Sequence, residues 1–257
     1  MAIINNTYIP TSEDERVFLE NYDPNKYEKP SVTTDITVFT ISEDNELSVL
    51  LIKRGGYPYK DKWAIPGGFV KIDESVDESA RRELKEETNL DNFAIEQFGT
   101  FGEVDRDPRM RVISVAYMAF VPKNALSIKA GDDASDAKLF KIHIDLDGIN
   151  FVSGNLTIKE SDLAFDHADI IRTAIKRLRN RIDYTEDAFK LLKNPKSFTI
   201  YELKKIYETV KGQKEDSANF RRTFYRKYLK TNIVEETGEI TENSGHRDAK
   251  LYRLVQS

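Results

Sequence analysis

The sequence contains no cysteine, and this absence excludes several kinds of site. Without thiols the chain can form no disulfide, bind no zinc through thiolates and use no cysteine nucleophile. No apolar run in it approaches the roughly 18 residues that a membrane-spanning helix needs. Its N-terminus has neither the basic start nor the apolar core of a secretion signal. We therefore expect a cytoplasmic protein that does not engage a membrane.

The chain as a whole has little excess of either charge, with 39 Lys and Arg against 44 Asp and Glu. Its two parts differ, however. Residues 1–165 carry 19 basic against 30 acidic side chains, whereas residues 166–257 carry 20 against 14. A hydrophobic content of 39% is enough for packed cores. The asymmetry predicts two modules, of which the basic one is the candidate for binding nucleic acid.

Hydrophobic patterning in the first part indicates a mixed domain. Ser75, with Glu78 three residues later, forms a capping box that starts a helix over 76–88. Residues 1–30 are interpreted as a polar arm before the first regular element, and another helix is expected near 165–181. This order predicts an α+β sandwich. β-branched segments place its strands at 31–41, 47–54, 63–70, 94–101, 112–121 and 137–143.

The stretch GFVKIDESVDESARRELKEETNL, residues 68–90, carries the most specific motif. It follows the spacing G-x5-E-x7-R-E-U-x-E-E-x-G-U, where U is aliphatic. One position departs, because Asn89 stands where the pattern has glycine. That position lies just past the expected helix end, where a left-handed residue is favoured, and Asn is the next choice after Gly. The departure therefore does not argue against function.

The acidic residues of this motif indicate a metal site. Glu83, Glu86 and Glu87 are three or four residues apart, so they project from one side of the helix and repel one another. A divalent cation would neutralise them, and oxygen ligands without Cys or His favour Mg²⁺ or Mn²⁺. Such a metal would bridge phosphate oxygens and activate water. Arg82 is close enough to orient Glu86, and Gly68 lets the backbone approach without a Cβ.

This stretch resembles the Nudix box, the signature of pyrophosphohydrolases that cut nucleoside diphosphates linked to another group. The resemblance implies a Nudix-type α/β/α sandwich that splits ADP-ribose, or a similar compound, into AMP and a sugar phosphate. It implies Glu83, Glu86 and Arg82 as catalytic residues, and Gly68, Glu83, Glu86 and Glu87 as metal ligands. The general base stays open between a box glutamate and an acid of a later loop. The candidate loop acids, chosen by their position in the sequence alone, are Glu103, Asp105, Asp132 and Asp133.

Arginines are the expected substrate ligands, because their guanidinium groups bind diphosphates with bidentate geometry. One ends a predicted strand and three cluster in the segment DRDPRMR. The alternative, a hairpin loop held by Asp–Arg pairs, fits the cluster equally well. The candidates are Arg54, Arg106, Arg109 and Arg111.

The basic second part has the element order of a winged helix-turn-helix. Helices are expected over 199–210 and 217–230, followed by short strands at 233–236 and 250–255. The second helix has an aromatic stripe and a basic face away from it, as a recognition helix requires. The alternative is that the basic face is only solvated. Candidate DNA contacts are Arg221, Arg222, Arg226 and Lys227 on the helix, with Arg247 and Lys250 on the wing.

Residues 198–255 resemble the winged helix of Nudix-related transcriptional regulators, through FTIYELKKIYE, NFRRTFYRKYL and HRDAKLYRL. The match is looser where those regulators have Gly-Arg-Pro and this chain has Gly245-His246-Arg247-Asp248. We predict an arm (1–30), a Nudix domain (31–165), linker helices (166–195) and a winged helix (196–257). The preferred function is a Nudix hydrolase of ADP-ribose. The alternative is a homodimeric regulator of double-stranded DNA that responds to ADP-ribose or a sugar derivative, with the Nudix domain as sensor.

Overall fold

The computed structural model describes residues 8–88, 90, 93–126, 134–241 and 248–255, without the side chains of residues 87, 88, 134 and 135. A mixed sheet forms its centre, with the strand order β5-β6-β1-β2-β7-β8-β9. β3 and β4 pair with β2 and β1 beside this path. The strands are β1 (Ser31–Ile41), β2 (Leu47–Arg54), β3 (Trp63–Ala64), β4 (Gly67–Phe69), β5 (Ile95–Phe101), β6 (Val112–Phe120), β7 (Ala134–Asp145), β8 (Gly148–Ser153) and β9 (Leu156–Lys159).

The sheet is covered by a helix on each face, which confirms the predicted α/β/α sandwich. Successive residues of a strand point to opposite faces. Ile36 and Val38 of β1 therefore pack with Leu84 of α2 (Val76–Thr88), whereas Phe39 packs in the cluster that contains α3 (His167–Arg181). β1 and β6 are paired in parallel, and the other strand pairs are antiparallel. The capping box predicted for α2 is present, since Ser75 and Glu78 exchange hydrogen bonds.

The second module is a winged helix. It consists of α5 (Ile200–Lys211), α6 (Ser217–Phe224), β10 (Val234–Ile240) and β11 (Lys250–Leu254). α6 continues as a π-helical turn, Tyr225–Leu229 (η3), and the two together are called the recognition helix below. α5 starts at a Thr199 capping box and ends at Gly212, whose φ of 69° is the left-handed conformation that glycine tolerates.

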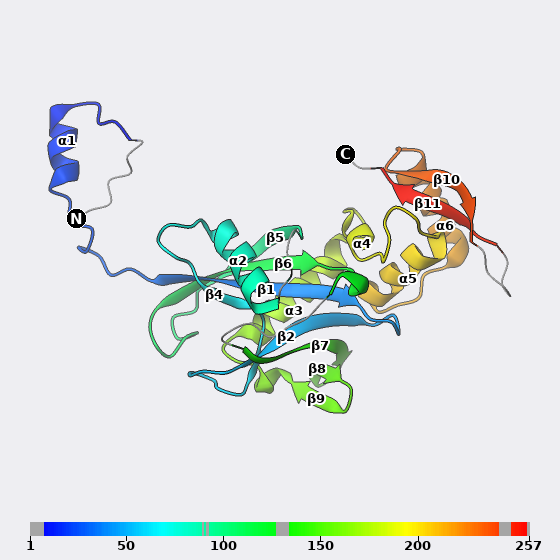
Figure 1. The fold of residues 1–257 in the computed structure, drawn as a ribbon, viewed down its shortest axis with the longest axis horizontal. Helices are drawn as coiled ribbons and strands as arrows, with labels where there is room; N and C mark the ends of the chain where they lie inside the picture. Colours follow the sequence, from blue (N-terminus) through cyan, green and yellow to red (C-terminus); the bar gives the residue numbers. More distant parts are fainter. Residues whose placement is uncertain (1–7, 89, 91–92, 127–133, 242–247, 256–257) are drawn as a thin grey trace.

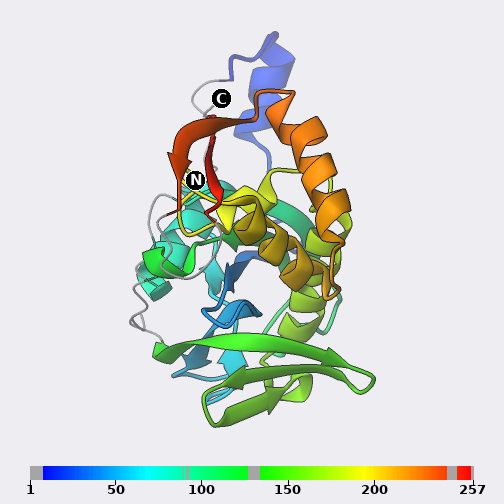
Figure 2. The same ribbon diagram turned by 90° about the vertical axis from the view of Figure 1, so that its right-hand side faces the viewer.

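One continuous hydrophobic cluster joins the two modules. It contains Phe39 and Met118 of the sheet, Leu178 of α3, and Phe224 and Tyr252 of the winged helix. Figure 2 shows α3, in yellow-green, between the sheet and the orange recognition helix. A large apolar interface of this kind restricts independent domain motion. The domain boundaries near 165 and 195 therefore stay predictions.

The expectation that residues 1–30 precede the first regular element was wrong, and their assignment as an arm stays a prediction. Residues Glu13–Glu20 form helix α1, which begins where the Ser12 hydroxyl accepts a hydrogen bond from the Glu15 amide. α1 buries no residue and stands away from the body, at the opposite end from the winged helix (Figure 1). Ser12 and Glu15 have the spacing of a capping box, a signal that the sequence carried.

Several short elements were not predicted. They are β8 and β9 and the 3-10 helices η1 (Lys123–Ala125) and η2 (Glu160–Asp162), whereas α4 (Asp187–Lys190) lies within the predicted linker helices. Such short segments have no periodicity long enough to assign from sequence. None of the helices in the described residues has the length and apolar character needed to cross a membrane.

Candidate functional site

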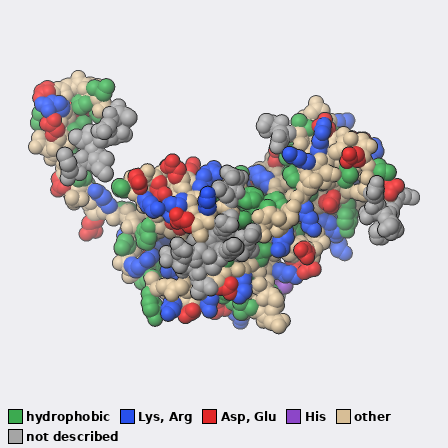
Figure 3. Space-filling view, viewed as in Figure 1, with side chains coloured by type: hydrophobic (Ala, Val, Ile, Leu, Met, Phe, Trp, Pro, Cys, Tyr) green, Lys and Arg blue, Asp and Glu red, His purple; other side chains and the backbone are tan. Residues whose placement is uncertain are grey.

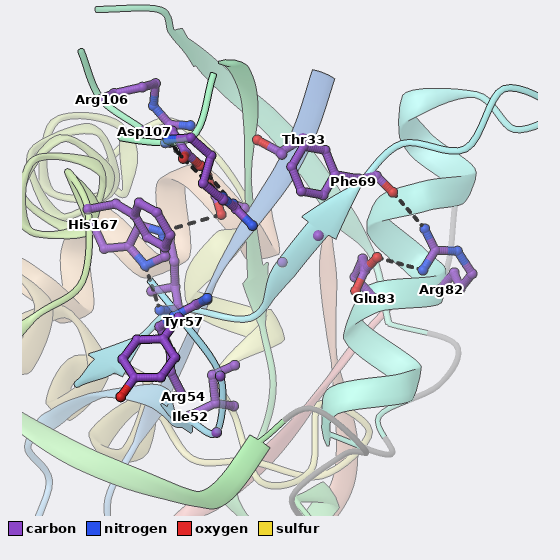
Figure 4. Close-up of a pocket in the computed structure, with 18 of the residues that line it drawn as sticks. Thr33, Ile52, Arg54, Tyr57, Phe69, Arg82, Glu83, Arg106, Asp107 and His167 are labelled. Carbon is purple, nitrogen blue, oxygen red and sulfur yellow. Dashed lines mark hydrogen bonds and ion pairs between the residues drawn. The ribbon is translucent and has the colours of Figure 1, made fainter. Parts of the chain in front are cut away.

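A cavity of about 790 Å³ opens between the sheet, α2 and the start of α3. Figure 4 shows Glu83 and Arg82 on one side of it and Arg106, Asp107 and His167 on the other. Its lining carries five cationic and three acidic side chains, so the charge balance favours an anion. The cationic ones are Arg54, Lys71, Arg82, Arg106 and Arg109, and the acidic ones are Asp35, Glu83 and Asp107.

Arg82 is the centre of the box, because its guanidinium contacts three box carboxylates. The nitrogen-to-oxygen distances are 2.6 Å to Glu74, 2.5 Å to Glu83 and 3.0 Å to Glu86. The hydrogen bond from Arg82 lowers the pKa of Glu74 to about 2, with a further contribution from the Lys71 amide. Figure 3 shows this mixture of acidic and basic side chains over α2. Arg82 therefore lies where it can orient the carboxylates, and its catalytic role stays a prediction.

Glu83 is the most buried of the box carboxylates that the structure describes, with 9% of its surface exposed. Burial raises the pKa of Glu83, although the hydrogen bond from Arg82 acts in the opposite direction. Gly68 faces it so closely that a Cβ there would lie 2.2 Å from Glu83 Oε1. This contact explains why the motif requires glycine at position 68.

The donor set fits a hard divalent cation in part. Glu83 supplies carboxylate oxygens beside the half-buried backbone of Gly68, and Glu86, more exposed and absent from the cavity lining, is joined to Glu83 through Arg82. Among the described side chains, however, no group of three or more His, Cys, Asp or Glu is arranged to hold a metal ion. The side chain of Glu87, the fourth predicted ligand, and Asn89 lie outside the described residues.

Three of the four predicted substrate arginines line the cavity, namely Arg54, Arg106 and Arg109. Arg111 does not, because its guanidinium donates to the carbonyl oxygen of Glu103 at 2.8 Å. The Asp–Arg alternative is also present, since Arg109 pairs with Asp107 at 2.8 Å. Arg109 therefore both lines the cavity and pairs with an aspartate.

Aromatic rings hold two of these arginines in place. The guanidinium carbon of Arg54 lies 4.9 Å from the centre of the Phe165 ring, and that of Arg109 lies 5.9 Å from it. Arg109 also lies 5.2 Å from the Phe69 ring centre. Phe165 has a φ of 51°, which is strained for a bulky residue. The ring is therefore fixed in the cavity wall by its surroundings.

A buried polar network under the cavity was missed from the sequence. His167 Nδ1 accepts a hydrogen bond from the Ile65 amide at 3.1 Å, and its Nε2 lies 3.5 Å from Asp35 Oδ1. Burial lowers the pKa of His167, so the ring is neutral with its proton on Nε2. Arg106 joins the network through Asp35 and Asp166, at 3.3 and 2.6 Å. The sequence feature that could have predicted this network is Asp35, because a charged residue within a buried β-branched strand requires a partner.

The structure does not identify a general base among the loop acids. Glu103 and Asp105 are exposed and are absent from the cavity lining. Asp132 and Asp133 lie outside the described residues.

The predicted DNA contacts on the recognition helix differ in their exposure and in their bonds within the protein. Arg221, Arg222 and Arg226 are exposed, and we call them the arginine face. Lys227 instead donates to the carbonyl oxygen of Asp183 and, at 2.7 Å, to the Tyr228 hydroxyl, so it is engaged inside the protein. On the wing, Lys250 pairs with Glu236 at 2.9 Å, and Arg247 lies outside the described residues.

Comparisons with known proteins agree with both modules. The NUDIX domain model matches residues 33–147, and the NrtR DNA-binding winged helix domain model matches residues 188–254. An Acinetobacter baylyi protein named "ADPR responsive transcriptional repressor NtrR" is 33% identical over 246 residues, which cover 94% of this chain and 88% of that protein. The chain belongs to the NrtR branch of the Nudix family.

Two further matches differ in how much of the chain they cover. An ADP-ribose pyrophosphatase of Methanocaldococcus jannaschii is 40% identical over 146 residues, 57% of this chain and 73% of that protein. The crystal structure of Shewanella oneidensis NrtR complexed with a 27mer DNA has a TM-score of 0.67 and 29% identity, covering 87% of this chain and 93% of that chain. The enzyme relative matches a shorter part of the chain than the NrtR proteins do.

Proposed function

We propose that this protein is a DNA-binding transcriptional regulator in which the Nudix domain senses ADP-ribose. The observation that carries the proposal is the joining of a winged helix to the Nudix domain through one hydrophobic core. A hydrolase has no need of an exposed recognition helix packed against its fold. The regulator, which the sequence left as the alternative, is therefore placed first.

The proposal assigns DNA binding to the arginine face. Phe220, Phe224 and Tyr228 of the recognition helix are buried, which directs its arginines outward. A helix of this kind enters the major groove, where arginines contact phosphates and guanine edges. Two copies on a palindromic site would act as a homodimer, and a regulator of this kind works in the cytoplasm beside the chromosome.

The proposal assigns ligand binding to the cavity. Its cationic lining suits a diphosphate, and arginines stacked on aromatic rings are held ready to bind it. Binding there stabilises one arrangement of the protein only if the ligand has different affinities for the DNA-bound and free states.

The test is a two-step binding experiment with the full-length protein. DNA that binds the protein is first selected from a random library, and its affinity is then measured by fluorescence anisotropy with and without ADP-ribose. We expect ADP-ribose to change the affinity, and AMP with ribose 5-phosphate to have a weaker effect. Failure to select any DNA, or an affinity that ADP-ribose leaves unchanged, would contradict the proposal.

Hydrolysis of ADP-ribose is proposed as a second function, supported by the arrangement of Gly68, Glu83 and Glu86. Glu83 and Glu86 would hold Mg²⁺ or Mn²⁺ together with Gly68 and Glu87. The metal would supply Lewis acidity at the pyrophosphate. Arg82 keeps the carboxylates oriented, and Arg54 and Arg109 would hold the phosphates. Release of AMP from ADP-ribose in the presence of Mg²⁺ tests this function, and a turnover-free protein that still binds ADP-ribose would leave sensing as the sole role.

A further inference from the structure

Helix α3 has one end in the cavity wall and the other at the recognition helix. It comprises 15 residues, which at the rise of an α-helix span about 22 Å. Phe165 and His167 at its start line the cavity, and Asp166 between them binds Arg106. The β1–β2 hairpin also reaches from the cavity to the winged helix, since Ile52 and Arg54 line the cavity and its turn accepts a hydrogen bond from Thr209 of α5, but α3 is bonded to the recognition helix as well.

The start of α3 is held by groups that a bound diphosphate would engage. Arg54 and Arg109 both lie within 6 Å of the centre of the Phe165 ring, at 4.9 and 5.9 Å. Phosphate oxygens attract guanidinium groups more strongly than a ring face does. When these arginines turn to a ligand, the strained Phe165 keeps its ring contacts with Tyr59 and His167 but loses those with Arg54 and Arg109.

The end of α3 is bonded to the winged helix by four side chains, which we call the joint: Arg179, Asp183, Lys211 and Lys227. Arg179 Nε donates to the carbonyl oxygen of Val210 at 2.9 Å. Lys211 Nζ lies 2.7 Å from Asp183 Oδ1, and Lys227 Nζ donates to the Asp183 carbonyl oxygen. Both helices of the winged helix are thus bonded to the last turn of α3 or to the residues that follow it.

The middle of α3 transmits displacement because it is tightly packed. Ile170, Ile171, Ala174 and Leu178 are completely buried in the shared core. Packed interiors resist compression, so a shift at one end of such a helix is carried to the other. Arg177 and Arg181 bond α3 to β5, an edge strand that is paired on one side only and can follow the helix.

We infer that α3 couples the occupancy of the cavity to the position of the recognition helix, and that the joint is where this coupling reaches the DNA-binding module. The inference rests on the proposed sensor function and names its route. It assigns Asp183 and Lys211 as positioning residues that contact neither the ligand nor DNA.

The test uses Asp183→Asn and Lys211→Met, which break one ion pair from its two sides, and the double variant Arg179→Met with Asp183→Asn. The ion pair is partly exposed, so the fold should be retained. The coupling factor is the ratio of the DNA dissociation constants with and without saturating ADP-ribose. Allosteric factors are typically about 5 to 150, and we expect the variants to lower the wild-type value at least about threefold.

Ligand-free DNA affinity and ADP-ribose affinity should each stay within about twofold of wild type in these variants, because only the connection is removed. Asp169→Asn is the matched control. It removes an exposed ion pair with Arg172 on the same helix, away from the joint, and should leave the coupling factor unchanged. Melting temperatures identify any variant that fails to fold.

Hydrogen exchange gives a readout that needs no DNA. ADP-ribose should change amide exchange in residues 179–183 and 224–229 of the wild type, and the changes in 224–229 should diminish in the double variant. Wild-type coupling that persists undiminished in all three variants would overturn the inference alone. Absence of coupling in the wild type would instead overturn the proposed sensor function, and the inference with it.

Discussion

The cavity and the recognition helix use arginine in opposite ways. Arg82 contacts three glutamates, and Arg106 is buried between Asp35 and Asp166. Arg221 and Arg226, in contrast, are exposed and make no ion pair with any carboxylate in the described part of the chain. Paired arginines keep a fixed geometry and suit a small ligand, whereas unpaired surface arginines suit a long polyanion whose phosphates they neutralise.

The largest expected effect is on hydrolysis. Glu83→Gln keeps the shape of the side chain but removes the buried charge, so AMP release from ADP-ribose should fall by about 1000-fold. DNA affinity should be unchanged, because Glu83 lies in the cavity and the arginines expected to bind DNA lie on the recognition helix. Glu103→Gln, in an exposed loop, is the control. Equal turnover by Glu83→Gln and wild type would remove Glu83 from the catalytic set.

A second test concerns the arginine face. Changing Arg221, Arg222 and Arg226 together to Ala should weaken DNA binding by about 100-fold and flatten its dependence on salt, since three phosphate neutralisations are lost. ADP-ribose binding, measured by calorimetry, should stay at the wild-type value. If DNA affinity survives, the face is only solvated surface.

Within the cavity, Arg54→Ala or Arg109→Ala should weaken ADP-ribose binding about tenfold, the usual loss for a hydrogen bond to a charged group. Arg111→Ala offers a matched control, because Arg111 comes from the same loop as Arg109 but bonds the Glu103 carbonyl instead. Equal losses in all three variants would mean that the cavity does not define the binding site.

The smallest effect is on stability against pH. His167 is neutral in the folded protein because burial lowers its pKa, whereas in the unfolded chain it titrates near 6.5. Below that pH the unfolded state takes up a proton that the folded state excludes, so stability falls as pH decreases. His167→Gln should reduce the difference in unfolding free energy between pH 8 and pH 5 in denaturant titrations. An unchanged pH dependence would show that His167 is not its source.

Local signals predicted much of the fold and of the box. Helix α2 was predicted over about the residues that it occupies, because the Ser75 capping box and the helical spacing of Ala80 and Leu84 are local signals that span only a few residues. The same kind of signal at Ser12 and Glu15 was present and overlooked, so α1 was missed. The short hairpin β8–β9 gave no periodic signal.

Other features depend on contacts that the sequence does not reveal. Nothing local indicates that Lys227 bonds to Asp183, whereas its neighbour Arg226 is exposed. Nor does the segment DRDPRMR reveal that Arg109 faces the cavity and Arg111 does not. Side-chain direction at these positions is fixed by packing against other elements.

The sequence by itself determined the two modules, the box with its carboxylates and the basic recognition helix, because these depend on spacings within a few turns of chain. Only the tertiary structure decided which arginines surround the cavity and that α3 connects it to the winged helix. Those features require residues such as Ile65 and His167, 102 positions apart, to meet at hydrogen-bonding distance. Such long-range contacts depend on how whole helices and strands bury their apolar faces against one another. No local sequence pattern encodes that packing.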